Sequence, residues 1–113
     1  MNDSIPLLID TDPGVDDALA LLMAFNSSRH HLLGLCITAG NVGLDYTTAN
    51  ALKLCEVAGV TVPVYPGCDR PLVFAAEDAS YVHGRDGFGD IGYAPAQRRH
   101  ESVHAALAIL RES

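Results

Sequence analysis

The sequence is poor in basic residues and in long apolar runs. Seven Lys and Arg stand against fourteen Asp and Glu, which gives a formal charge of -7. Because no basic cluster offers a face that neutralises phosphates, nucleic acid and anionic membrane surfaces are not expected as partners. The longest apolar run, Ala18 to Phe25, is far shorter than the roughly 20 residues that span a membrane. No basic segment precedes an apolar stretch at the N-terminus, so the sequence shows no secretory signal.

Cysteine is also scarce. Cys36, Cys55 and Cys68 are an odd number and lack the spacing of a metal site. Such cysteines suit reduced thiols, so we expect a cytoplasmic protein. No neighbour in sequence indicates an activated thiolate at Cys68. We expect four of the five histidines to be solvated, at positions 30, 31, 100 and 104.

What remains is typical of one folded domain of alternating strands and helices. Hydrophobic residues make up 49% and charged residues 19% of the 113 positions, which favours a globular chain over a disordered one. Apolar runs predict strands at 5–10, 31–38 and 60–65, and helix formers predict helices at 16–26 and 45–58. This order predicts right-handed crossovers onto one Rossmann-like open parallel sheet with flanking helices, an α/β fold.

Single residues predict details of these elements. The segment 16–26 is apolar nearly all round, so we expect it to be buried on more than one side. Asp45 is expected to cap the second helix, and Gly59 to end it in a left-handed conformation. The stretch 66–99 has no periodicity and predicts a long surface loop. After it, Glu101–Arg111 regains a helical period.

Four carboxylates lie where the first predicted strand turns into the first predicted helix. They are Asp10, Asp12, Asp16 and Asp17. The first two point to the same face of an extended strand, and the Pro13-Gly14 turn brings the helix start beside them. Like charges repel by about 4 kcal/mol per pair at about 4 Å and an effective dielectric constant of about 20, so a cation is expected among them. Oxygen ligands favour Ca²⁺ or Mg²⁺; the alternative is that these acids only cap the helix and face solvent.

These carboxylates belong to the segment DTDPGVDD, at Asp10–Asp17. Three further segments follow it in order: TAGN at Thr38–Asn41, VYPGCDRPL at Val64–Leu72 and HGRDGFGD at His83–Asp90. Together they resemble, in order and approximate spacing, the motifs of the inosine/uridine-preferring nucleoside hydrolases. The resemblance implies that residues 1–113 are the N-terminal portion of a single nucleoside hydrolase domain, so that the sheet is incomplete.

The resemblance also implies a reaction and a cofactor. Members of the family hydrolyse the N-glycosidic bond of ribonucleosides to ribose and free base, with Ca²⁺ at the strand ends. Asp12 corresponds to a metal ligand that is also the general base. The other matching residues are the metal ligands Asp10 and Asp17 and the substrate-binding residues Asp16, Asn41 and His83. For the full-length form we expect a homo-oligomer.

Later residues of the family pattern fall outside this sequence, among them further metal ligands and a second ribose-binding asparagine. We therefore expect little or no hydrolase activity from the isolated chain, and weak Ca²⁺ binding that depends on Asp12 and Asp17. A rival interpretation is a non-catalytic remnant that binds ribose or nucleoside weakly, or that associates with itself through uncovered faces.

A second rival is a Mg²⁺-dependent phosphatase of the haloacid dehalogenase type, which also has an Asp-x-Asp motif at the end of its first strand. In that class the fourth residue after the first Asp is usually Thr or Val, whereas Gly14 stands here. The adjacent pair Asp16-Asp17 does not belong to its pattern either. The residues therefore favour the nucleoside hydrolase interpretation.

Overall fold

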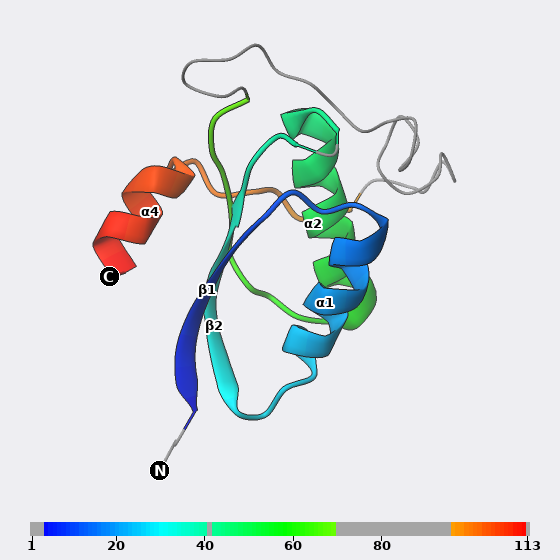
Figure 1. Ribbon diagram of the computed structural model, residues 1–113, viewed down its shortest axis with the longest axis vertical. Coiled ribbons are helices and arrows are strands. Elements are labelled where there is room, and N and C mark those ends of the chain that lie inside the picture. Colours follow the sequence, from blue (N-terminus) through cyan, green and yellow to red (C-terminus); the bar gives the residue numbers. More distant parts are fainter. Residues whose placement is uncertain (1–3, 41, 70–95, 113) are drawn as a thin grey trace.

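The computed structural model of the chain describes residues 4–40, 42–69 and 96–112 (Figure 1). Its elements are β1 (Ile5–Thr11), α1 (Val15–Phe25), β2 (His30–Ile37), α2 (Leu44–Ala58), β3 (Val64–Pro66) and α4 (Ala105–Glu112). Strands and helices alternate from β1 to β3, which confirms the predicted α/β organisation. Within the described ranges, no helix is both long and apolar enough to cross a membrane.

The strands form one parallel sheet in the order β1-β2-β3. At its carboxyl edge Thr11 of β1 pairs with Ile37 of β2, and Ile37 pairs with Pro66 of β3. Neighbours in sequence are neighbours in the sheet, as expected for strands joined by right-handed crossovers. The three carboxyl ends therefore lie side by side, and residues that follow the strands meet there.

Helices cover both faces of the sheet (Figure 1). Alternate side chains of β2 point to opposite faces. Leu35 and Ile37 are fully buried in the cluster with residues of α1 and α2, whereas Cys36 is buried with Tyr65 and Ala108 beneath α4. This two-sided burial explains why the β2 sequence is almost continuously apolar.

The third strand is shorter than predicted. The prediction was 60–65, but β3 begins at Val64. The Pro63 carbonyl still accepts the N–H of Leu35 in β2 at 2.8 Å. The carbonyls on either side of it bond to the chain that leads to α4: the Arg98 side chain donates to Val62 at 2.6 Å, and the Glu101 N–H donates to Val64 at 2.7 Å. The outer edge of β3 is thus covered by the chain that leads to α4.

The prediction that the first helix is buried on more than one side is wrong for this chain. Leu21 is 2% exposed, but Leu19 and Met23 are 67% and 75% exposed. α1 packs against α2 and the sheet with one face. Its opposite face is apolar and open.

The second helix begins before Asp45, the residue predicted to cap it, and is capped differently. Its N-cap is Gly43, with no side-chain hydrogen bond, and Asp45 lies inside the first turn. There the carboxylate still interacts favourably with the helix dipole. The predicted end is confirmed, since Gly59 adopts a left-handed conformation with φ of 70°.

The last helix begins at Ala105, later than the predicted Glu101. The hydrogen bond from the Glu101 N–H to the Val64 carbonyl at 2.7 Å ties the residues before α4 to β3. His104 caps α4: its Nδ1 atom accepts a hydrogen bond from the Ala106 N–H at 3.1 Å. Of the predicted loop 66–99, only the first and last four residues fall within the described part of the chain.

Candidate active site at the carboxyl end of β1

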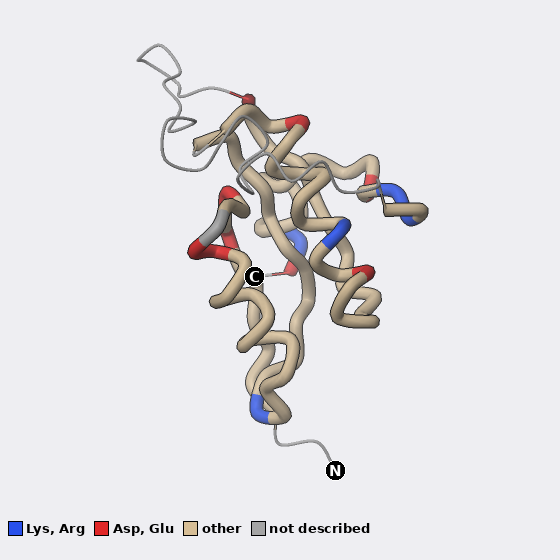
Figure 2. Tube along the Cα trace, turned by 90° about the vertical axis from the view of Figure 1, so that its right-hand side faces the viewer, with Lys and Arg blue, Asp and Glu red and all other residues tan. Residues whose placement is uncertain are grey.

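Three residues connect β1 to α1: Asp12, Pro13 and Gly14. Backbone hydrogen bonds fix this turn on both sides, from the Thr38 N–H to the Thr11 carbonyl at 3.1 Å and from the Ala18 N–H to the Gly14 carbonyl at 3.0 Å. Figure 2 shows acidic residues on both sides of the turn. Open parallel sheets bind their ligands beyond the carboxyl ends of the strands, which is where the turn lies.

A buried amide holds the turn to the second helix. Asn50 of α2 is 0% exposed, and its Nδ2 atom donates to the carbonyl of Pro13 at 3.0 Å. The bond joins residues 37 positions apart in sequence, so it sets where the turn lies relative to α2. Sequence reasoning missed this residue. The only indication in the sequence is that Asn50 occupies a position on the apolar side of the second helix, where a polar amide is unusual.

The carboxylates of the turn interact with one another. Asp17 is half-buried, and its pKa is raised chiefly by burial and then by the negative charges of Asp12 and Asp16. A side-chain hydrogen bond with Asp12 also favours protonated Asp17, and only the Gly14 N–H opposes these effects. The predicted proximity of strand-end and helix-start carboxylates is therefore observed for these three residues.

The segment that follows β2 approaches Asp12 closely. A methyl group added to Gly40 would overlap the Oδ2 atom of Asp12 and would lie 2.9 Å from its Cγ. Only a glycine leaves enough space for the carboxylate here. Gly40 of the TAGN segment therefore lies against the Asp12 side chain and limits the positions that this side chain can adopt.

The remaining predicted site residues are not gathered in this way. Asp10 is exposed and pairs in register with Cys36, whose pKa is raised by burial and then by the Asp10 charge. Asn41 and His83 lie outside the described residues. In the part of the chain that the structure describes, no group of three or more His, Cys, Asp or Glu side chains is placed to hold a metal ion.

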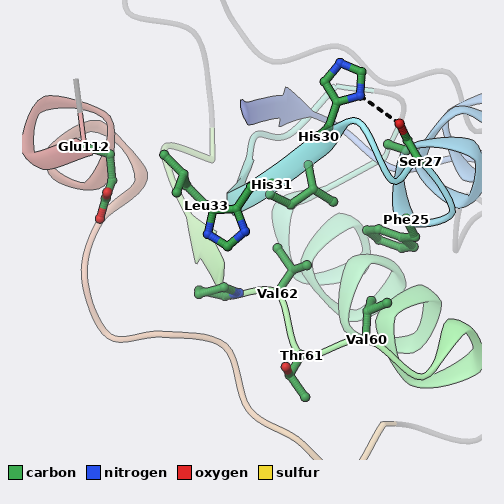
Figure 3. Close-up of a pocket in the computed structure, with 12 residues that line it drawn as sticks. Phe25, Ser27, His30, His31, Leu33, Val60, Thr61, Val62 and Glu112 are labelled. Atoms are coloured by element: carbon green, nitrogen blue, oxygen red, sulfur yellow. Dashed lines mark hydrogen bonds between the residues drawn. The ribbon is translucent and has the colours of Figure 1, made fainter. Parts of the chain in front are cut away.

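A cavity of about 470 Å³ lies at the other end of the sheet, where β2 begins and the chain enters β3 (Figure 3). Apolar side chains such as Phe25, Val60 and Val62 line it, with His31 at its side. His30 is hydrogen-bonded to Ser27 at 2.9 Å between Nδ1 and Oγ. The carboxylates of the β1–α1 turn do not line this cavity, so it is separate from the candidate site.

Comparison with known proteins gives a consistent result. Residues 7–113 match the family model described as inosine-uridine preferring nucleoside hydrolase. The chain is 45% identical over 102 residues to uridine nucleosidase 1 of Arabidopsis thaliana, covering 88% of this chain and 30% of that protein. It is 40% identical over 106 residues to the inosine-uridine preferring nucleoside hydrolase of Leishmania major, covering 92% and 34%.

Solved structures show the same fold. The purine-preferring ribonucleoside hydrolase from Gardnerella vaginalis superimposes with a TM-score of 0.88 at 31% identity, covering 96% of this chain and 36% of that one. An inosine-guanosine nucleoside hydrolase gives a TM-score of 0.86 at 36% identity, covering 94% and 33%. The chain therefore spans about a third of the length of the relatives that it matches.

Proposed function

Because the chain belongs to the family of inosine-uridine preferring nucleoside hydrolases, we propose that it carries the carboxylate part of a site that hydrolyses the N-glycosidic bond of ribonucleosides. The products of that reaction are ribose and a free base. The observation that supports this most directly is the pair Asp12 and Asp17 at the carboxyl end of β1. The family match also favours this reaction over the phosphatase considered from the sequence.

A Ca²⁺ ion fits the donors of the turn. Asp12 and Asp17 supply hard carboxylate oxygens of the kind that Ca²⁺ takes as ligands. The negative charge of Asp12 contributes to the raised pKa of Asp17, and a divalent cation relieves repulsion of this kind. These two residues would hold the ion, with Asp10 as a supporting ligand. When bound, Ca²⁺ supplies positive charge that polarises a water molecule beside the sugar.

The residues of the chain would have distinct tasks in the reaction. Asp12 would accept a proton from the attacking water as general base. Asp16, exposed in the first turn of α1, would accept a hydrogen bond from a ribose hydroxyl. As the glycosidic bond breaks, the ribose ring gains positive charge, which the carboxylates of Asp12, Asp16 and Asp17 stabilise.

The proposal extends to residues outside the described part of the chain. Asn41 follows the TAG segment whose Gly40 contacts Asp12, so it would bind the ribose at the same edge of the sheet. His83 would contact the ribose or the base. We also propose a cytoplasmic location, which the three free cysteines support, and a homo-oligomer for the full-length form.

Calorimetric titration with CaCl₂ tests the role of the carboxylate pair. We expect the chain to bind Ca²⁺ weakly and Asp12→Asn and Asp17→Asn to lose that binding, because each removes one charged ligand. Asp45→Asn is the matched control, since Asp45 also lies in the first turn of a helix but outside the site. Binding heat that is absent at millimolar Ca²⁺, or unchanged in both site variants, contradicts the proposal.

Release of ribose from inosine and uridine is the second readout on the same proteins. We expect it to be slow or absent in the isolated chain, because Ca²⁺ takes about six to eight oxygen ligands and the turn supplies two carboxylates. Release that requires Ca²⁺ and is lost in Asp12→Asn assigns the activity to this chain itself. Nucleoside binding that persists without Ca²⁺ and in Asp12→Asn would instead identify a non-catalytic remnant.

A further inference from the structure

A thiol and an imidazole meet near the carboxyl end of β3, on residues that the proposed hydrolysis does not use. Cys68 follows β3, and His104 immediately precedes α4. Their side chains come together although the residues are 36 positions apart in sequence: Sγ of Cys68 lies 3.7 Å from Nε2 of His104. Both side chains are exposed, so reagents in solution reach them.

The second hydrogen bond of the imidazole defines its tautomer. Nδ1 of His104 accepts the N–H of Ala106 at 3.1 Å, so Nδ1 carries no hydrogen. In a neutral imidazole the hydrogen then resides on Nε2. The nitrogen that faces Cys68 is therefore a donor, and it points its N–H at the sulfur.

Packing at the start of α4 keeps the ring in this position. His104 is the N-cap residue of α4, and Ala105 next to it is 5% exposed. Gly67 precedes Cys68, and a methyl group added to it would lie 3.0 Å from the Ile37 carbonyl oxygen and 3.3 Å from the Ala105 Cβ. The absence of a side chain at Gly67 thus allows α4 to begin against the end of β3, which brings the two side chains together.

The other two cysteines provide an internal comparison. Cys36 and Cys55 are each 1% exposed, and burial is the main cause that raises the pKa of both thiols. Buried cysteines of this kind are chemically inert. Reagents that attack thiols in the folded chain should therefore react at Cys68.

We propose that Cys68 and His104 form a reactive thiol–imidazole pair that is a site of covalent modification by small-molecule disulfides. The Cys68 sulfur attacks one sulfur of a disulfide RSSR, a new S–S bond forms, and the bond between the two sulfurs of RSSR breaks. The departing RS⁻ takes up the proton that Cys68 released, so the products are a mixed disulfide on Cys68 and RSH. The Cys68 sulfur is oxidised to the disulfide level, and one sulfur of RSSR is reduced and leaves as the thiol RSH. The Nε2–H of His104 faces the sulfur that bears negative charge during the attack.

Kinetics with 2,2′-dithiodipyridine, an uncharged disulfide, test the pair on the whole chain. One thiol should react per folded chain, and peptide mass spectrometry should place the adduct on Cys68. His104→Asn retains an oxygen that caps α4 but removes the Nε2–H. We expect this variant to react about threefold to tenfold more slowly, the net effect of losing one hydrogen bond. Cys68→Ser should abolish the native reaction.

The design separates loss of the imidazole from loss of the fold. If His104→Asn unfolded the chain, Cys36 and Cys55 would also react, and the number of reactive thiols per chain would rise from one to three. In that case His104→Ser, which also places a capping residue at this position, is measured instead. Rates of the urea-unfolded proteins should be equal in all His104 variants. A folded His104 variant that reacts at the wild-type rate overturns the proposal, as does an adduct on Cys36 or Cys55 in the folded chain.

Discussion

Asp17 shows how a partly buried carboxylate of the candidate site opposes folding. Its pKa is raised by burial, by Asp12 and by Asp16, so the folded chain binds a proton at Asp17 more tightly than the unfolded chain does. The stabilisation from this group is fully present below its unfolded pKa and is lost as the pH rises through its folded pKa. Without a cation, ionisation of Asp17 therefore opposes folding.

We predict that Asp17→Asn stabilises the cation-free chain, and that the gain over wild type grows as the pH rises above the ordinary pKa of an Asp side chain, because ionisation of the wild-type carboxylate then costs more in the folded chain than in the unfolded chain. Urea unfolding in EDTA at several pH values measures the difference. Asp45→Asn is expected to have the opposite sign at pH 7, a loss of about 0.3–1 kcal/mol, since a charge near a helix N-terminus is favourable. Equal behaviour of the two variants would mean that repulsion at the turn is negligible.

At the scale of elements, the site is positioned by contacts between segments far apart in sequence. The β1–α1 turn is held by α2 through the bond from Asn50 to the Pro13 carbonyl, and Gly40 of the segment that follows β2 lies against Asp12. Each contact comes from a strand end or helix face that the parallel topology brings to the same edge. The geometry of Asp12 therefore depends on how β1, β2 and α2 pack together.

We predict that Asn50→Leu costs about 1–3 kcal/mol of unfolding free energy, because it leaves the Pro13 carbonyl without its buried donor. It should also weaken Ca²⁺ binding without touching a ligand. Thr48→Val on the same helix is the control: its Oγ1 atom is buried and has no hydrogen-bond partner among the described residues, so the fold should lose little. Urea unfolding and calorimetry measure both effects, and equal costs for the two variants would refute the role of Asn50.

The sequence predicts elements well where local signals decide. Apolar runs located both ends of β1 and of β2 to within one residue, and Gly59 identified the end of α2. The predicted start of α4 was wrong because Glu101 is hydrogen-bonded to Val64 of β3. The predicted length of β3 was wrong because the Val62 carbonyl bonds to the distant Arg98 side chain. The carboxylates are neighbours in the sequence and could be predicted from it. The roles of Asn50 and His104 could not, because each depends on a contact with a residue far away in the sequence.

At the scale of the whole molecule, the apolar outer face of α1 is exposed. Leu19 and Met23 lie four positions apart, on the same side of the helix, and are 67% and 75% exposed. Exposed apolar patches of this kind favour association. The formal charge of -7 opposes association only partly, since salt screens it.

We predict that the chain self-associates at high concentration and in salt, and that Met23→Lys reduces this association by removing an exposed apolar side chain. Light scattering over a concentration series measures it. Ala20→Lys is the matched control, because Ala20 is also an exposed residue of α1 and the charge change is identical. If both variants reduced scattering equally, charge rather than the apolar face would be responsible.

The position of α4 on the face opposite α1 and α2 has a topological consequence. Crossovers between parallel strands are right-handed in nearly all proteins. On the α1 side of the sheet, right-handed crossovers add each new strand in the direction from β1 to β3. On the α4 side the direction is reversed, so a crossover through a helix there adds a strand beside the outer edge of β1. The other outer edge, along β3, is covered near Arg98 and Glu101. In the longer relatives β1 would then be the topological switch point, where a crevice opens directly beyond Asp12.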